Sequence, residues 1–358
     1  MRTIFKTRYE QDLTLARHGG DYFWYGLLLA GMLLVPVLLG EFYVKELTGL
    51  LLFSIAGVGL MLLIGYTGLV SLGHAAFMGI GAYANAALLA RGVPFVISLP
   101  AAVAITAAAG AGIGIPTLRM SGLYLAIATL AFGGIVENVF SKWDSVTGGF
   151  DGLAVKSPDL FGWKIQGVDG VYYLALLALV FVLWLAANIL RSPLGRALVA
   201  IRDSEISAQS MGINLSRYKT IAFAISAGIT GLAGALYGHY SRHLAPDGFN
   251  ILFSIQLVTI VFVGGLGSLH GAIFGAIFVS SLPQAIAIMR DYLPSKLANL
   301  PGLEPSLFGL ILVLCILFQP SGIYGWWLRL KTYFINFPLQ RKASARRQKS
   351  YAKSERLR

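Results

Sequence analysis

The chain has 358 residues, of which 56% are hydrophobic and only 12% are charged, with a formal net charge of +12. Soluble domains carry about twice that share of charged residues. The composition therefore excludes a soluble enzyme, a secreted disulfide scaffold and a nucleic-acid binder. Each helical crossing of a bilayer takes about 20 apolar residues, and runs of that length recur from residue 21 to residue 320. The sequence predicts an all-α, polytopic helical membrane protein.

The apolar runs predict about ten transmembrane helices, preceded by a short N-terminal segment (1–21) and followed by a basic tail (326–358) within which no span is expected. The predicted spans are residues 22–40, 47–66, 73–90, 93–115, 121–140, 171–190, 220–240, 253–269, 271–289 and 306–320. The turns at 65–73 and 264–271 contain no charge. Either turn could therefore belong to a broken or re-entrant helix instead of joining two full crossings.

The distribution of Lys and Arg predicts the orientation of the chain. With ten spans, 20 of the 28 basic residues fall on the side that holds both termini and the 191–219 loop. Because basic loops stay in the cytoplasm, we expect both termini and that loop to be cytoplasmic and the 141–170 loop to lie outside. The tail sequence RKASARRQK (341–349) is expected to contact anionic membrane lipids, with no role in nucleic-acid binding.

The source of energy is constrained by motifs that the sequence lacks. There is no G-x-x-x-x-G-K-[ST] motif, so the chain has no P-loop with which to bind a nucleotide. Of the acidic residues, only Glu137 falls within a predicted span, where it could reach the interface or serve as a coupling acid. His239 and His243 are i,i+4 neighbours without an evident third ligand, so no metal site is expected. An ion gradient or another subunit must therefore supply the energy.

The 191–219 loop contains the signals of a short helix. Asp203 or Ser204 can cap its N-terminus, Glu205 lies in the first turn and Gly212 can close it. We expect two or three helical turns, on which apolar Ile206 and Met211 and small Ala208 offer a surface either to a partner protein or to lipid headgroups.

An internal similarity links two glycine-rich segments. Residues 68–77 and 265–274 match at six of ten positions, with an offset of 197. Transporters are often built from repeats whose broken helices border the substrate path. The polar side chains there are Ser71, His74, Ser268 and His270, and we expect these four near a translocation path.

The outer loop contains the motif Thr147-Gly148-Gly149-Phe150-Asp151-Gly152. A loop this rich in glycine can form tight turns or dock a partner, and the pattern does not separate the two. Thr147, Gly148, Gly149 and Asp151 are therefore candidates for docking.

Five motifs occur in one order: GYTGLVSLGHAAFMGIGAY (65–83), PTLRMSGLYLAIATLAFG (116–133), TGGFDGL (147–153), SPLGRALVAIRDSEISAQSMGINLSRYK (192–219) and GGLGSLHGAIFGA (264–276). Together they resemble the permease subunit of branched-chain amino acid ABC importers, and more closely the larger of its two paralogous permeases. The resemblance covers roughly residues 50–325.

The resemblance implies a permease of the bacterial inner membrane that is not itself an enzyme. It implies three kinds of partner: a periplasmic substrate-binding protein, a second paralogous permease and two cytoplasmic ABC ATPases. ATP and Mg²⁺ would bind to the ATPases, so this chain needs no cofactor. The 191–219 loop is similar to the coupling loop of such permeases. Glu205, Ala208 and Gly212 match its pattern, and with Asp203 they are the expected ATPase contacts.

Two other functions remain open. A stand-alone ion-coupled carrier of small polar solutes would use Glu137 as its coupling acid. A permease of the same family could instead serve urea, amides or aromatic acids. The urea branch tends to have Gln where this chain has His74, which argues against urea. Many relatives carry an acid at the position of Gly134, whereas here the acid is Glu137.

Overall fold

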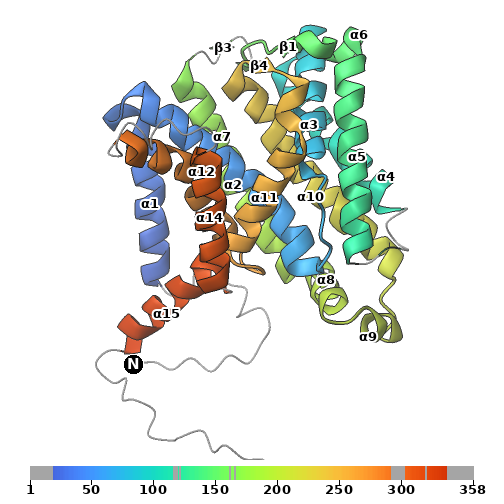
Figure 1. Ribbon diagram of the computed structural model, residues 1–358, viewed down its shortest axis with the longest axis vertical. Helices are drawn as coiled ribbons and strands as arrows, with labels where there is room; N and C mark the ends of the chain where they lie inside the picture. The colour runs from blue at the N-terminus through green and yellow to red at the C-terminus, as the bar shows by residue number, and fades with distance from the viewer. Residues whose placement is uncertain are drawn as a thin grey trace, which may run out of the picture.

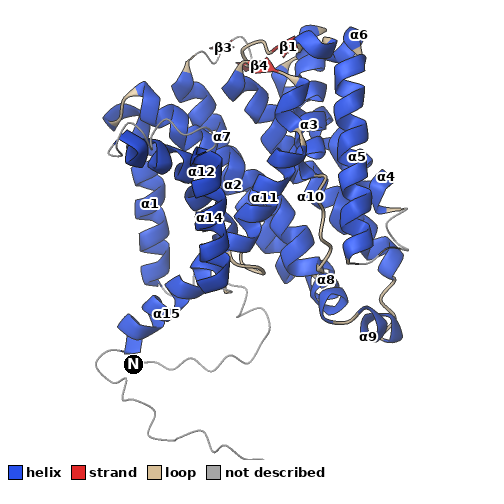
Figure 2. Ribbon diagram, in the orientation of Figure 1, coloured by secondary structure: helices blue, strands red, loops and turns tan. Residues whose placement is uncertain are grey.

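The computed structural model describes residues 19–115, 120, 122–160, 163–164, 167–291, 303–318 and 321–336. These residues form helices joined by turns, with four strands of two residues each (Figure 2). The fold is all-α, as the composition predicts.

The elements follow one another along the chain (Figure 1). The first half contains α1 (Gly19–Leu38), α2 (Glu41–Thr67), α3 (His74–Ala90), α4 (Phe95–Gly114), α5 (Leu123–Lys142), α6 (Asp144–Thr147), η3 (Gly149–Asp151), β1 (Leu153–Ala154), β2 (Asp159–Leu160) and β3 (Trp163–Lys164). The second half contains α7 (Val168–Arg191), α8 (Pro193–Asp203), α9 (Glu205–Ser210), α10 (Leu215–Ser241), β4 (His243–Leu244), η4 (Pro246–Phe249), α11 (Ile251–Gly264), α12 (Leu269–Asp291), α14 (Leu303–Phe318) and α15 (Gly322–Asn336).

Each of the ten predicted spans falls on an apolar helix. Within the described residues, seven helical segments are long and apolar enough to cross a bilayer, and three shorter apolar helices cover 23–38, 74–90 and 306–315. The boundaries differ in places. The helix α10 begins at Leu215, inside the predicted loop, and the break between the predicted spans 253–269 and 271–289 lies earlier, at residues 265–268.

The helices α2 and α10 form the centre of the bundle. Both are mostly buried, and α10 packs against α2, α3 and α4. Small residues allow this packing, since a Cβ atom at Gly234 of α10 would overlap the carbonyl oxygen of Met78 in α3. The small-residue stripe of α10 therefore lets the two backbones approach closely.

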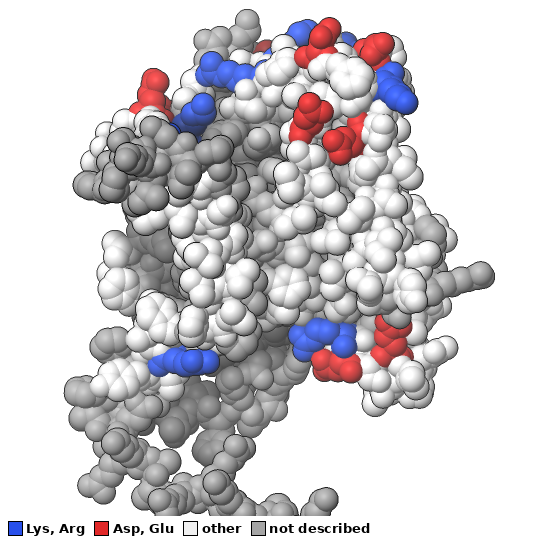
Figure 3. All heavy atoms as spheres, viewed as in Figure 1, with Lys and Arg blue, Asp and Glu red and all other residues white. Residues whose placement is uncertain are grey.

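The two ends of the bundle carry different loops. Figure 1 shows α8 and α9 at one end, and β1 and β4 at the other. The strands β1 and β4 pair antiparallel, with Leu153 opposite Leu244, and β2 pairs with β3. On the face drawn in Figure 3, the charged side chains gather towards the two ends and leave an uncharged band between them. That pattern fits a protein whose middle lies in hydrocarbon.

Candidate functional site

The two similar segments of the sequence form two breaks between helices. In the first, α2 ends at Thr67 and is followed by Gly68, whose φ is +77°, and α3 begins at His74. In the second, α11 ends at Gly264 and is followed by Gly265, whose φ is +112°, and α12 begins at Leu269. The serine at the matching position accepts a backbone hydrogen bond in each break, Ser71 from Gly73 and Ser268 from Gly271. The similarity in sequence therefore reflects a similarity in structure.

The two breaks lie against each other. A Cβ atom at Gly65, in the last turn of α2, would lie 2.8 Å from the backbone nitrogen of Gly267. Gly267 itself has a φ of +78°, a conformation that L side chains rarely adopt. Glycine is thus required on both sides of this contact, and we name residues 65–73 and 264–269 the first and second glycine turns.

The first glycine turn is anchored by a chain of hydrogen bonds through His74. Its Nδ1 lies 2.9 Å from Ser71 Oγ, and its Nε2 lies 2.8 Å from Ser226 Oγ on α10. Ser226 donates in turn to the carbonyl oxygen of Gly59 on α2, at 2.7 Å. One arrangement satisfies every group: a neutral His74 accepts from Ser71 at Nδ1 and donates to Ser226 from Nε2. His74 thereby ties the start of α3 to both central helices.

The second glycine turn has different partners. Ser268 caps the start of α12 by accepting from the backbone of Gly271 at 3.1 Å. His270 Nε2 lies 2.8 Å from the hydroxyl of Tyr25 on α1, and its ring stacks on that of Tyr324 in α15, with centroids 5.6 Å apart. The four polar residues predicted near a path thus fall into two pairs, one at each turn. Their role in transport stays a prediction.

The segment from α8 to α9 contains the predicted short helix with one of its two predicted caps, but differs from the prediction in other respects. Ser204, one of the two predicted caps, accepts from the backbone of Ser207 at 3.2 Å, while Asp203 pairs with Arg202 at 3.1 Å. Gly212 follows α9 with a φ of +82°. The α9 helix has six residues, fewer than the predicted two or three turns, and α8 precedes it as a separate helix of eleven residues.

Glu205 holds α9 to the bundle. Its carboxylate accepts from Lys219 Nζ of α10 at 2.7 Å, and the side chain of Lys219 is only 3% exposed. Ala208 is also buried, whereas Ile206 is 84% exposed and Met211 is 80% exposed. The free apolar surface of this segment is therefore formed by Ile206 and Met211, and not by Ala208.

The outer-loop motif forms a set of tight turns. Thr147 is buried, and its hydroxyl lies 2.6 Å from the carbonyl oxygen of Phe140 and 2.8 Å from that of Trp143. Gly148 and Gly149 both have positive φ angles, and a Cβ atom at Gly149 would overlap the carboxylate of Asp144. Turn formation explains Thr147, Gly148 and Gly149. The exposed residues of the motif are Asp151 and Phe150, the latter 78% exposed.

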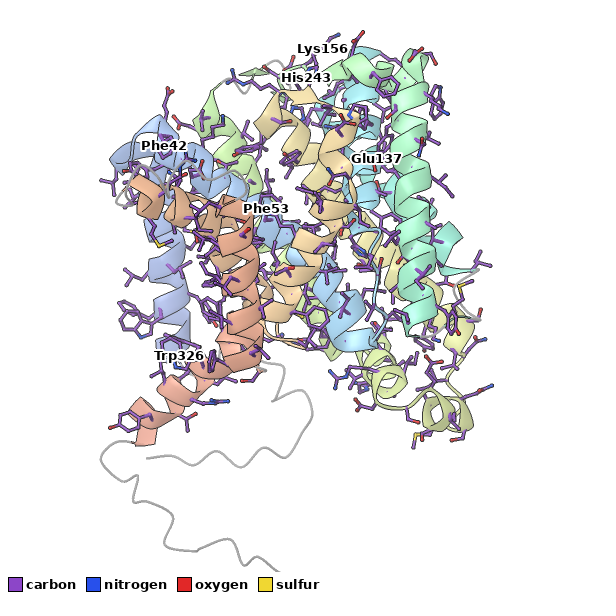
Figure 4. All side chains as sticks on the ribbon, viewed as in Figure 1. Phe42, Phe53, Glu137, Lys156, His243 and Trp326 are labelled. Atoms are coloured by element: carbon purple, nitrogen blue, oxygen red, sulfur yellow. The ribbon has the colours of Figure 1, made fainter. Side chains whose placement is uncertain are left out.

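Glu137 is partly exposed on α5. Figure 4 places it in the half of the bundle that also holds Lys156 and His243. Of the two residues next to it in the chain, Val136 is buried and Asn138 is exposed. Among the described residues, no group of three or more His, Cys, Asp or Glu side chains is arranged to hold a metal ion.

Sequence reasoning missed the residues whose importance depends on long-range contacts. Ser226 contacts His74 across 152 positions, and Lys219 resembled any other basic residue of the 191–219 loop. Arg202 was counted only as a topological charge, although it contacts both glycine turns. Only Phe150 had a local signal, since a large aromatic residue in a glycine-rich turn has few places to be buried.

Taken together, the apolar helices define a multi-pass membrane protein. The family model described as "Branched-chain amino acid transport system / permease component" matches residues 43–318. The chain belongs to this family of transport permeases.

Individual relatives support the family. The chain is 34% identical, over 80% of its length and 71% of the relative's, to the high-affinity branched-chain amino acid transport system permease protein LivM of Salmonella typhimurium. The same figures hold for LivM of Escherichia coli strain K12. The autoinducer 2 import system permease protein LsrC of Escherichia coli O157:H7 is 25% identical over 74% of this chain and 79% of its own length. No solved structure matches the chain.

Proposed function

We propose that this chain is the permease subunit of an ATP-driven importer, forming part of the inner-membrane path for branched-chain or other apolar amino acids. A periplasmic binding protein would deliver the substrate, and a second, paralogous permease would complete the path. Two cytoplasmic ABC ATPases would bind ATP and Mg²⁺, with no cofactor on this chain. The match to the permease family over residues 43–318 carries this proposal.

The α8–α9 segment is the proposed contact with an ATPase. Four residues would fix the conformation of this segment. Asp203 pairs with Arg202 and Glu205 forms an ion pair with Lys219 of α10. Ala208 is buried and Gly212 forms the turn that follows α9. Ile206 and Met211 would then enter a groove of the ATPase. Burying a side chain of this size stabilises a contact by about 1.5–3 kcal/mol, so this pair would contribute a substantial part of the contact.

The proposed orientation places α8, α9 and both termini in the cytoplasm. It rests on the excess of Lys and Arg on that side. The opposite end, with the outer-loop motif, would then face the periplasm. There Phe150 and Asp151 are the exposed groups available to a binding protein.

The proposed path runs beside the two glycine turns. Backbone groups that leave helical pairing at membrane depth are tolerated only where they are buried in protein or line a cavity. Ser71 and His74 would set the position of the first turn, and Ser268 and His270 that of the second. We propose weak substrate contacts along the path, because high affinity belongs to the binding protein.

The test is a pair of reciprocal variants, purified from the native membrane in mild detergent. In the first variant, Ile206→Asp and Met211→Asp are combined. The permease should remain inserted and paired with its paralogue, but the amount of ATPase that co-purifies with it should fall by a factor of about 100 or more. With Phe150→Asp, at the other end, the ATPase should co-purify normally, while the binding protein should no longer stimulate ATP hydrolysis. Normal retention of the ATPase by the double variant would contradict the proposed contact.

A further inference from the structure

Arg202 links the α8–α9 segment to the end of α2. It lies in the last turn of α8, and its Nη1 donates to the carbonyl oxygen of Gly65 at 2.9 Å. Its Nε and Nη2 both donate to Asp203 at 3.1 Å, which fixes the plane of the guanidinium. The last four carbonyl groups of a helix lack partners within it. Arg202 therefore supplies a charge-assisted partner to one of these carbonyls, at the helix end that favours a cation.

The same side chain lies against both glycine turns. A Cβ atom at Gly68 would lie 3.2 Å from Arg202 Cγ, and a Cβ atom at Gly267 would lie 3.4 Å from Arg202 Nη1. Gly65 in turn contacts the backbone of Gly267. One side chain from α8 thus meets two segments that are about 200 positions apart in the sequence, at the point where those segments meet each other.

We propose that Arg202 is a positioning residue that transmits movement of the α8–α9 segment to both glycine turns. This inference rests on the proposed function, in which an ATPase moves that segment. Because these glycines carry no side chain, Arg202 hydrogen-bonds the backbone of the first turn and lies beside Gly267 of the second with no side chain of these glycines between them. A displacement of α8 then shifts the end of α2 and the start of α12 together, without waiting for side chains between them to repack.

The chemistry of the guanidinium is suited to this role. Its planar fork reaches the Gly65 carbonyl from one nitrogen while two others are held by Asp203. A Lys side chain at this position would keep the charge but would offer a single rotatable ammonium group, which cannot hold both partners in one fixed geometry. Arg202→Lys should therefore assemble normally and still transmit movement poorly.

The experiment compares transport per ATP hydrolysed in proteoliposomes that contain the complete complex. The variants are Arg202→Ala and Arg202→Lys, with Arg217→Ala as the control, since it removes the same charge from the exposed start of α10. We expect transport per ATP hydrolysed to fall about tenfold in Arg202→Ala and by a smaller factor in Arg202→Lys. Arg217→Ala should behave as wild type. A residue with a purely structural role would lower assembly or thermal stability and leave this ratio unchanged.

Other results would overturn the inference in ways that can be told apart. Wild-type transport per ATP in Arg202→Ala would refute the role of Arg202 and leave the proposed function standing. If Arg202→Ala fails to assemble, wild-type transport per ATP in Arg202→Lys would refute it equally. If the wild-type complex itself shows no ATP-driven transport, the proposed function fails, and this inference fails with it.

Discussion

The ion pair between Glu205 and Lys219 allows a sharp test of how α9 is held. Lys219 is 3% exposed and Glu205 is 39% exposed, with their charged atoms 2.7 Å apart. Removing one partner of a fully buried pair costs about 3–5 kcal/mol, because the remaining charge is left without a partner. In Glu205→Gln the stranded charge is the buried ammonium. Since water reaches the carboxylate side, we discount the loss to about 2 kcal/mol of unfolding free energy.

The reverse substitution should be milder. In Lys219→Met the remaining carboxylate is the partly exposed partner, which water can hydrate, and the Met side chain fills most of the space of the Lys stem. We expect a loss of about 0–1 kcal/mol. The double variant, which has no stranded charge, should lie within about 1 kcal/mol of wild type.

Reversible unfolding in mixed micelles, followed by tryptophan fluorescence during titration with sodium dodecyl sulfate, measures the four free energies. A double-mutant cycle then gives the coupling between the two side chains. The reasoning is refuted if Lys219→Met destabilises the protein as much as Glu205→Gln, or if the two losses simply add.

Three further predictions follow from the glycine turns and from α5. Ser226→Ala leaves the buried Nε2–H of His74 without an acceptor and should lower the unfolding free energy by about 1–3 kcal/mol. The same detergent titration measures this loss. As a control, Ser216→Ala at the exposed start of α10 should change the unfolding free energy by less than about 0.5 kcal/mol. Gly65→Ala places a Cβ atom 2.8 Å from the backbone of Gly267 and should lose about 1–3 kcal/mol. By contrast, Gly112→Ala, with no neighbour within 4 Å, should gain up to about 1 kcal/mol, so equal effects of the two would contradict the close contact. Glu137→Gln should leave uptake of labelled leucine within about twofold of wild type, whereas abolished uptake in a complex that still assembles would favour an ion-coupled carrier.

The class of fold follows from the sequence because hydrophobicity alone decides it. Every predicted span corresponds to an apolar helix, since a run of about 20 apolar residues has few alternatives in a membrane protein. The positions of the helix breaks were also predictable, because a glycine-rich, uncharged segment separates two apolar runs at each place; in the structure Gly68 and Gly265 both have positive φ angles. The ends of the helices were less predictable. For example, α10 begins five residues before the predicted span.

The candidate site was harder to predict because its contacts join distant parts of the chain. His74 could be chosen as a polar residue beside a glycine turn, but its partner Ser226 comes from α10 and carries no local signal. The same holds for Arg202, which a charge count treats as equivalent to Arg217. Glu205 was chosen as a partner contact, yet its carboxylate is bound to Lys219 of the same chain. Periodicity predicts which face of a helix is apolar, but does not predict which side chain will fill a particular gap.

The most direct test of the central claim is the energy source for uptake. The chain would be purified from its native membrane with its associated subunits and reconstituted into proteoliposomes, with the binding protein and labelled leucine outside and ATP inside. The proposed function predicts uptake that requires ATP and persists when ionophores remove proton and sodium gradients. Uptake by the permease alone, driven by an ion gradient and indifferent to ATP, would contradict it.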